Sequence, residues 1–312
     1  MQYSVVDATD RGHARSDDRS IAGAGIGLRH CHLEQVLRER PPVPWLELLA
    51  DNHLAAGGLE HAGLEAISVR YPLTLHCVGM NLAGCDPLDH KYLRQIIQLR
   101  ERTGAAWVSD HLCFTAHNRR HYHELLPFPY TEEALRHVSE RVLAVQDLLQ
   151  APLVVENVSA YLRFADSSLS EAEFLAALTH ATDCELLLDL NNLYVNHVNH
   201  GDDVDAYLAA LPLARVREVH LAGHAVKPGY LLDAHNDRVS PPVWALFRRL
   251  VQALPEVPVL IEWDNDIPAL PVLLAEAERA RTERATALAA RTSAAGVAAD
   301  GRTQTAESVS PC

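Results

Sequence analysis

Short apolar runs that end abruptly in polar side chains recur along this chain. The stretch at residues 152–158, PLVVENV, places three apolar residues directly before Glu156 and Asn157. A run of this length bounded by polar residues is typical of a strand that is buried on both faces, as in a parallel sheet. With seven further apolar runs, the predicted strands cover residues 25–29, 45–50, 73–78, 105–112, 152–158, 184–190, 216–221 and 257–263.

The segments between these runs carry the signals of helices. After Thr131, apolar residues recur every three or four positions, which predicts an amphipathic helix up to residue 149. Ser170 and Glu173 form a capping box for the next helix, and Asp86-Pro87 predicts an N-cap and a first helical residue. The other predicted helices cover residues 32–40, 59–70, 202–211, 240–254 and 269–284, whereas the polar segment 115–130 is expected to be irregular.

Eight strands that alternate with helices predict an α/β protein with a (β/α)8 barrel. In this fold the active site lies at the C-terminal ends of the strands, where the polar residues of this chain are found. A doubly wound open sheet is the alternative, but it would not gather residues from so many strands around one centre. We expect one catalytic domain at residues 21–285, a disordered lead-in at residues 1–20 and a disordered Ala/Thr/Ser-rich tail at residues 286–312.

Composition narrows the classes of function. The formal net charge of −14 disfavours binding to nucleic acid or to an anionic membrane surface. No apolar run approaches the ~20 residues that span a bilayer, and the polar first 20 residues have no signal-peptide pattern. The six cysteines show no C-x-x-C pairing, so we expect reduced thiols and a cytoplasmic protein.

Six predicted strands end in side chains that can bind metals or catalyse reactions. They are His76, His111, Glu156, Asp189, His220 and Glu262. Imidazole and carboxylate ligands together suit zinc, manganese or iron, and the lack of a thiolate cluster argues against a structural zinc site.

A second group follows the seventh strand. Asp233 and His235 are two residues apart and lie on one side of an extended segment, and Asn192 can join them. The set then divides into three pockets, which hold His76, His111 and Glu156; Glu156, Asp189, His220 and Glu262; and Asn192, Asp233 and His235.

Each of these residues also has an ordinary structural interpretation. A single histidine at a strand end is more often hydrogen-bonded in the core than bound to a metal. Asp110 and Asp264 can orient neighbouring imidazoles, and His224 can support a ligand or face the substrate. The coincidence of six such residues at six strand ends favours a metal centre.

Several motifs, in order and with their spacing, resemble those of the multinuclear non-haem iron-dependent oxidative enzymes, which include methanobactin-pathway oxidases. The motifs are YPLTLHCVGMNLAG, WVSDHL, ELLPFPYTEEAL, VVENVSAYL, LLLDLNNLYVN, VHLAGH and LIEWD, and the resemblance covers residues 21 to about 280. The barrel also resembles the xylose isomerase and endonuclease IV type. The endonuclease pattern has a histidine in the third pocket where this chain has Asn192, and that departure favours the iron oxidases.

The resemblance implies two or three iron ions of mixed Fe(II)/Fe(III) valence, with O2 as co-substrate. The substrate would be a cysteine of a ribosomally made precursor peptide, bound through its thiolate and oxidised at its β-carbon, and a small partner protein would recognise the peptide leader. Glu156 would bridge two irons, and the catalytic group would be Glu156, Asp264 and His224. The segments 115–130 and 196–201 would form walls of the peptide entrance.

Two other classes of function stay open at this point. One is a zinc- or manganese-dependent hydrolase or sugar isomerase in the same barrel. A nuclease of this type would need a basic face, and a sugar isomerase usually needs a lysine beside its metals, which no predicted strand end provides. The other is a binding subunit whose metals only hold the barrel together, for which fewer complete ligand sets are expected.

Overall fold

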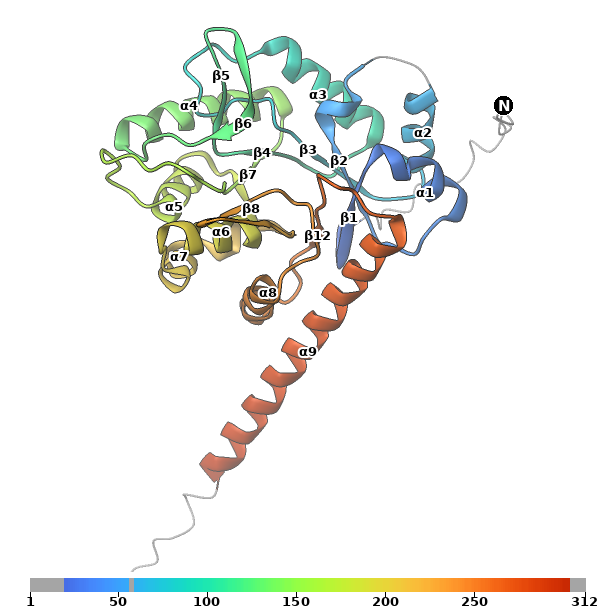
Figure 1. Cartoon of the computed structure of the whole chain (residues 1–312), viewed down its shortest axis with the longest axis vertical. Helices are drawn as coiled ribbons and strands as arrows, with labels where there is room; N and C mark the ends of the chain where they lie inside the picture. Colours follow the sequence, from blue (N-terminus) through green and yellow to red (C-terminus); the bar gives the residue numbers. More distant parts are fainter. Residues whose placement is uncertain (1–19, 56–58, 304–312) are drawn as a thin grey trace, which may run out of the picture.

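A closed barrel of eight parallel strands forms the centre of the protein, in a computed structural model that describes residues 20–55 and 59–303 (Figure 1). The barrel closes because β1 pairs in parallel with both β2 and β12, so the predicted (β/α)8 barrel is confirmed and an open sheet is excluded. In chain order the barrel strands are β1 (Ala24–Leu28), β2 (Leu46–Leu49), β3 (Leu73–His76), β4 (Val108–His111), β7 (Val154–Glu156), β8 (Glu185–Asp189), β9 (Val216–Leu221) and β12 (Val259–Ile261).

Helices surround this barrel (Figure 1). Thr131 caps α4 by accepting a hydrogen bond from the backbone N–H of Ala134, and Ser170 and Glu173 form the predicted capping box of α5. The α-helices are α1 (Leu33–Glu39), α2 (Leu59–Ser68), α3 (His90–Thr103), α4 (Glu132–Leu149), α5 (Glu171–Thr182), α6 (Leu190–His200), α7 (Val204–Ala210), α8 (Pro241–Ala253) and α9 (Leu270–Thr303). Short 3-10 turns are η1 (His30–His32), η2 (Ala50–His53) and η3 (Leu213–Arg215).

The barrel strands are buried on both faces, which explains their continuous apolar runs. Close packing is tightest at Gly25 in β1, where a Cβ atom would lie 2.5 Å from two ring carbons of Trp45. Trp45 is fully buried, so the glycine is what allows the indole to reach the core.

Two local predictions before α4 are wrong. Helix α3 begins at His90, not at residue 87, because the carboxylate of Asp89 caps it by accepting hydrogen bonds from the next turn. Asp86 instead accepts a hydrogen bond from the backbone of Arg119. That arginine lies in a hairpin of β5 (Phe114–His117) and β6 (Arg120–Leu126), within the segment expected to be irregular. Asn118 and Arg119 both have positive φ, as two-residue hairpin turns require.

The segment after β8 also differs from the expectation. Asp189 is both the last residue of β8 and the N-cap of α6, which runs directly on to His200. The expected turn at residues 196–201 is therefore the last turn of α6 and its Gly201 cap, where φ is +76°. A small hairpin of β10 (Ala225–Lys227) and β11 (Tyr230–Leu232) then follows β9.

Helix α9 is longer than expected. We predicted helix to residue 284 and an irregular tail from residue 286, whereas α9 continues to Thr303 and extends away from the barrel (Figure 1). Its sequence beyond residue 284 is rich in alanine, the residue with the highest helix propensity. Residues 1–19 and 304–312, which hold most of the predicted lead-in and the end of the predicted tail, lie outside the described residues.

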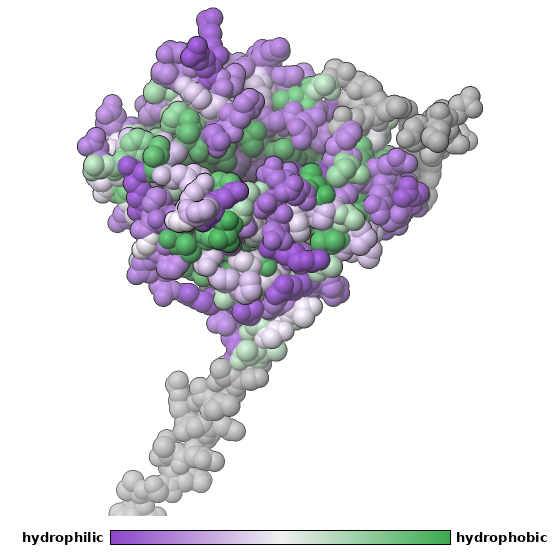
Figure 2. All heavy atoms as spheres, in the orientation of Figure 1, coloured by the Kyte–Doolittle hydropathy of each residue, from purple (hydrophilic) through white to green (hydrophobic). Residues whose placement is uncertain are grey.

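The surface is mainly polar on the face that Figure 2 shows, where hydrophobic residues appear mostly between hydrophilic ones. Among the helices that the structure describes, none is long and apolar enough to cross a bilayer. The described cysteines, Cys31, Cys77, Cys85, Cys113 and Cys184, are all free thiols.

Candidate metal centre

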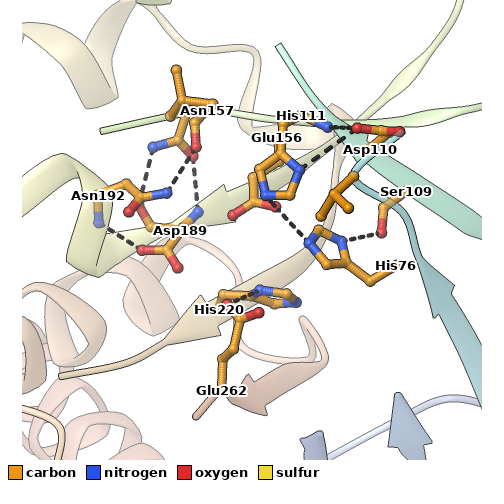
Figure 3. Close-up of polar contacts among 12 residues, drawn as sticks. His76, Ser109, Asp110, His111, Glu156, Asn157, Asp189, Asn192, His220 and Glu262 are labelled. Atoms are coloured by element: carbon orange, nitrogen blue, oxygen red, sulfur yellow. Dashed lines mark hydrogen bonds and ion pairs between the residues drawn. The ribbon is translucent and has the colours of Figure 1, made fainter. Parts of the chain in front are cut away.

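The ends of six barrel strands bring buried imidazoles and carboxylates into one cluster (Figure 3). All six side chains predicted from the strand ends are buried, and those of Glu156, Asp189 and His220 are completely inaccessible. The register of the parallel strands aligns them, since His111 pairs with Glu156, and Asp189 pairs with His220.

The first group in this cluster consists of His76, His111 and Glu156. The Nε2 atoms of His76 and His111 lie 3.4 Å and 3.2 Å from Oε2 of Glu156. The opposite nitrogens face other partners, because Nδ1 of His76 lies 2.8 Å from the Ser109 hydroxyl and Nδ1 of His111 lies 3.6 Å from Asp110. Both imidazoles therefore turn Nε2 toward the same carboxylate, as ligands of one metal ion would.

The second group contains Glu156, Asp189, His220 and Glu262, with four potential ligand atoms within 4.8 Å of one another. Nδ1 of His220 lies 3.0 Å from Oε2 of Glu262. Three carboxylate oxygens of this group have no hydrogen-bond partner among the described residues: both oxygens of Glu156 and Oδ2 of Asp189. A buried carboxylate without partners is costly, so these atoms fit a bound cation, and Glu156 is placed to serve both groups.

The third group lies around His235. Its Nε2 is 2.7 Å from Oδ1 of Asp233 and 3.8 Å from Oδ2 of Asp189, which connects this group to the second. Nδ1 of His235 is 3.1 Å from both Glu262 and Asp264. The Asp233–His235 pair predicted from its spacing is thus together in space.

Two neighbouring asparagines of α6 lie beside the ligand groups. Nδ2 of Asn191 donates to Oδ1 of Asp233 at 2.8 Å. The predicted Asn192 donates from Nδ2 to the carbonyl of Asn157, and its backbone N–H donates to the carboxylate of Asp189. Oδ1 of Asn192 is buried and has no hydrogen-bond partner among the described residues, so it can serve as an oxygen ligand.

Asp264 and His224 lie at the edge of the cluster. Asp264 accepts a charged hydrogen bond from Arg29 through Oδ1, while Oδ2 faces Nδ1 of His235. His224 is half-buried, and its Nδ1 lies 2.8 Å from Oδ1 of Asn191. Asp264 therefore contacts His235, and His224 contacts Asn191, the neighbour of Asp233.

Three buried charged residues near the centre were not predicted from the sequence. Arg29 follows β1, and its guanidinium lies 3.7 Å from Glu262. Glu47 in β2 and Glu218 in β9 lie inside the barrel, 3.2 Å and 3.5 Å from Nε2 of His220. The sequence could have indicated the two glutamates, because each interrupts an apolar run, WLELL for Glu47 and VREVH for Glu218. Glu218 also shares a strand face with His220, which follows two residues later.

The cluster holds carboxylates and imidazoles in different protonation states. Burial raises the pKa of Asp189 to about 7, and burial together with the charge of Glu218 raises that of Glu47 to about 7. Burial alone would lower the pKa of His111, but the neighbouring carboxylates outweigh it and raise that pKa to about 9. Glu262 shows the opposite shift, because His235 and His220 overcome its burial and hold its pKa well below the usual value.

The donor set fits a first-row transition metal. Imidazole nitrogens and carboxylate oxygens suit iron, manganese and zinc. The nearby thiols of Cys77 and Cys113 are buried, and burial raises the pKa of each well above its ordinary value. They stay protonated at neutral pH, so the groups described above offer only nitrogen and oxygen ligands.

Sequence comparisons match this chain to a protein family and to several relatives. The family model of the RiPP precursor modification enzymes MbnB/TglH/ChrH matches residues 23–285. A UPF0276 protein from Acaryochloris marina is 48% identical over 263 residues, which cover 84% of this chain and 95% of that protein. A second, from Anaeromyxobacter, is 46% identical over 272 residues, covering 87% and 96%.

Solved structures share the barrel at low sequence identity. Endonuclease IV from Thermus thermophilus superposes with a TM-score of 0.54 at 18% identity, over 85% of this chain and 99% of that one. A D-psicose 3-epimerase from Clostridium cellulolyticum gives a TM-score of 0.53 at 10% identity, over 85% and 96%. These likenesses concern the fold alone.

Proposed function

Because this chain belongs to the family of RiPP precursor modification enzymes MbnB/TglH/ChrH, we propose that it is a multinuclear non-haem iron oxidase. Its substrate would be a cysteine residue of a ribosomally synthesised precursor peptide, with O2 as co-substrate. The observation that carries the proposal is Glu156, which is fully buried, has no hydrogen-bond partner among the described residues and belongs to two groups of potential ligands.

Each of the three ligand groups would hold one iron. His76, His111 and Glu156 would hold the first iron, and Glu156, Asp189, His220 and Glu262 would hold the second. Asp233 and His235 would hold the third together with Asn192, whose Oδ1 is buried and has no hydrogen-bond partner among the described residues. Bound iron would supply O2 activation and a position for the cysteine thiolate, which leads to loss of hydrogen from the cysteine β-carbon.

The protein itself excludes water and fixes the ligands. The carboxylates of Glu156 and Asp189 are completely buried, which strengthens their interaction with a cation. Ser109 holds the outer nitrogen of His76 and Asp264 holds that of His235, while Asp110 lies 3.6 Å from the outer nitrogen of His111. These contacts orient the imidazoles before a metal arrives, which reduces the ordering cost of binding.

The segment that follows Glu156 provides a surface for a peptide. The exposed side chains Tyr161, Leu162 and Phe164 lie on it, and Tyr161 accepts a hydrogen bond from the backbone N–H of Asp233 at 2.8 Å. A cavity of about 530 Å³ next to this segment is lined by aromatic and apolar residues such as Tyr130 and Leu162 together with polar and acidic ones such as Asp202. We infer that the peptide enters along this segment, with a small partner protein recognising its leader.

Metal analysis tests the proposal. The chain would be produced in 57Fe medium together with its partner, and its metal content and Mössbauer spectrum would be measured. Two or more irons per chain in coupled or mixed-valence states are expected. Stoichiometric zinc or manganese without iron, persisting under iron-replete expression, would favour a hydrolase or isomerase instead.

A further inference from the structure

Two glutamates that take no direct part in the three ligand groups above meet inside the barrel. Glu47 from β2 and Glu218 from β9 are buried, and together with His220 their potential ligand atoms lie within 4.8 Å of one another. Oε1 of Glu47 lies 3.2 Å and Oε1 of Glu218 lies 3.5 Å from Nε2 of His220. Burying two carboxylates in an apolar barrel interior costs free energy unless each is paired with a positive charge or accepts hydrogen bonds.

The outer oxygen of each glutamate is held by a donor, one from β3 and one from the residue directly before β4. The Thr74 hydroxyl donates to Oε2 of Glu47 at 3.0 Å, and the indole N–H of Trp107 donates to Oε2 of Glu218 at 2.7 Å. These two bonds fix both carboxylates and turn their Oε1 atoms toward His220. In the described part of the chain neither Oε1 of Glu218 nor Nε2 of His220 has a hydrogen-bond partner, so the Oε1 atoms of the two glutamates are the acceptors that face a hydrogen on Nε2.

The other nitrogen of His220 faces the ligand groups, because Nδ1 lies 3.0 Å from Glu262. A neutral imidazole that binds a metal through one nitrogen carries its hydrogen on the other, and a carboxylate is the usual acceptor for that hydrogen. A second cation at Nε2 would require the ring to lose both hydrogens. The geometry therefore favours a hydrogen-bonding role for the two glutamates over a separate cation site.

We propose that Glu47 and Glu218 are positioning residues, which accept the Nε2 hydrogen of His220 and so hold its Nδ1 toward the second metal of the centre. This inference rests on the proposed metal centre and deepens it. It predicts that the pair sets the metal affinity of the second group without contacting a metal itself.

The test compares Glu47→Gln and Glu218→Gln with the wild-type chain. Both changes keep the side-chain shape but replace the negatively charged carboxylate, the acceptor of the imidazole hydrogen, by a neutral amide. We expect the affinity of the second site for Fe(II), measured anaerobically by chelator competition, to fall about 10- to 100-fold. The corresponding Mössbauer component should weaken, while the components of the other sites persist.

Control variants separate this role from a structural one. Glu171→Gln changes a half-buried glutamate, which accepts hydrogen bonds from Tyr130 and Tyr207, and should leave the metal affinity unchanged. Trp107→Phe and Thr74→Val remove only the donors to the glutamates and should weaken the second site by a smaller factor. The melting temperature of each glutamine variant without metal shows whether it folds. If one does not fold, Trp107→Phe and Thr74→Val still test the positioning role.

The outcomes distinguish this inference from the proposed function. A wild-type chain that binds no metal overturns both. A metal-loaded wild type whose affinity is unchanged in both glutamine variants overturns the positioning role alone. Loss of an additional metal equivalent from the variants, with the second site unaffected, would show a separate cation site and would likewise overturn it.

Discussion

Glu156 is the residue that two ligand groups share, so a change there acts on both. Its neighbours His76 and His111 approach Oε2 from one side, and Asp189 and Glu262 belong to the group on the other side. A glutamine has the same shape but is a weaker metal ligand than a carboxylate.

We expect Glu156→Gln to lose metal from the first and second groups together and to abolish activity. Metal content per chain, compared with that of the wild type, measures this. A matched control is Glu171→Gln, which removes a carboxylate away from the ligand groups and should keep the full metal content. A fully loaded and active Glu156→Gln protein would refute the bridging role.

The third group should be separable from the other two. Asp233→Ala or His235→Ala is expected to lower the metal content by about one equivalent. Asp233 lies 2.7 Å from His235, and only His235 also approaches the second group. Proportional loss from every site, measured by metal analysis and Mössbauer spectroscopy, would contradict the division into groups.

Comparison of the two neighbouring asparagines refines this prediction. Asn192→Ala should weaken the third site, because it removes a buried side-chain oxygen that has no hydrogen-bond partner among the described residues. Asn191→Ala should weaken it less, because the Asn191 side chain donates to Asp233 and faces His224. The metal content of the two variants, measured side by side, checks this.

That the strand-end side chains lie close together could be predicted because the carboxyl ends of the parallel strands meet at one end of the barrel. Strands buried on both faces have no apolar–polar alternation, so the sequence alone does not tell which side chains face the barrel interior. Glu47 and Glu218 were missed for this reason.

At the scale of elements, local signals predicted helix starts well where a side chain caps the helix directly. Thr131 and Ser170 both cap the helices that were predicted for them. The start of α3 was misplaced because Asp86 and Asp89 offer the same chemistry three residues apart. The β5–β6 hairpin was missed because none of the seven residues of β6 is buried, so the strand shows no alternation of buried and exposed positions.

The cap of α4 allows a test that is independent of the metals. Thr131 accepts a hydrogen bond from the backbone N–H of Ala134 at 3.1 Å. Thr131→Ala should lower the free energy of unfolding by about 1 kcal/mol, whereas Thr131→Ser keeps the acceptor and should stay close to the wild type. Urea unfolding measures both. Equal stability of all three proteins would show that the cap contributes nothing.

At the scale of the whole molecule, the candidate metal centre lies inside the barrel, so the charges of its buried side chains affect the free energy of unfolding. Without metal, these buried groups must hold protons to reduce their charge. Burial raises the pKa of Asp189 to about 7, and burial with the charge of Glu218 does the same for Glu47. Nearby carboxylates raise the pKa of His111 to about 9 despite its burial.

These shifts predict how the stability of the metal-free chain depends on pH. The folded state holds protons that the unfolded state has released, so stability falls as pH rises. For Glu47 and Asp189 the fall extends from their ordinary pKa values of 4.5 and 3.8 to about pH 7. Between pH 7 and 9 the fall comes from histidines such as His111, whose pKa rises from 6.5 to about 9. The carboxylates at Glu47 and Asp189 lose their protons near pH 7, and His111 loses its proton near pH 9. The opposite shifts of His76 and Glu262 act only below their ordinary values of about 6.5 and 4.5, outside this range.

Metal ions replace those protons, so the loaded chain should depend less on pH over the same range. We therefore expect the melting temperature to rise on metal binding by more at pH 9 than at pH 7. Thermal unfolding of chelator-treated and Fe(II)-loaded protein, measured anaerobically at pH 7, 8 and 9, checks this. Glu156→Gln, expected to bind less metal, should show little rise at any of these pH values. A rise in the wild type that is constant or shrinks toward pH 9 would mean that the protons are not released by metal, and that the ligands lie elsewhere.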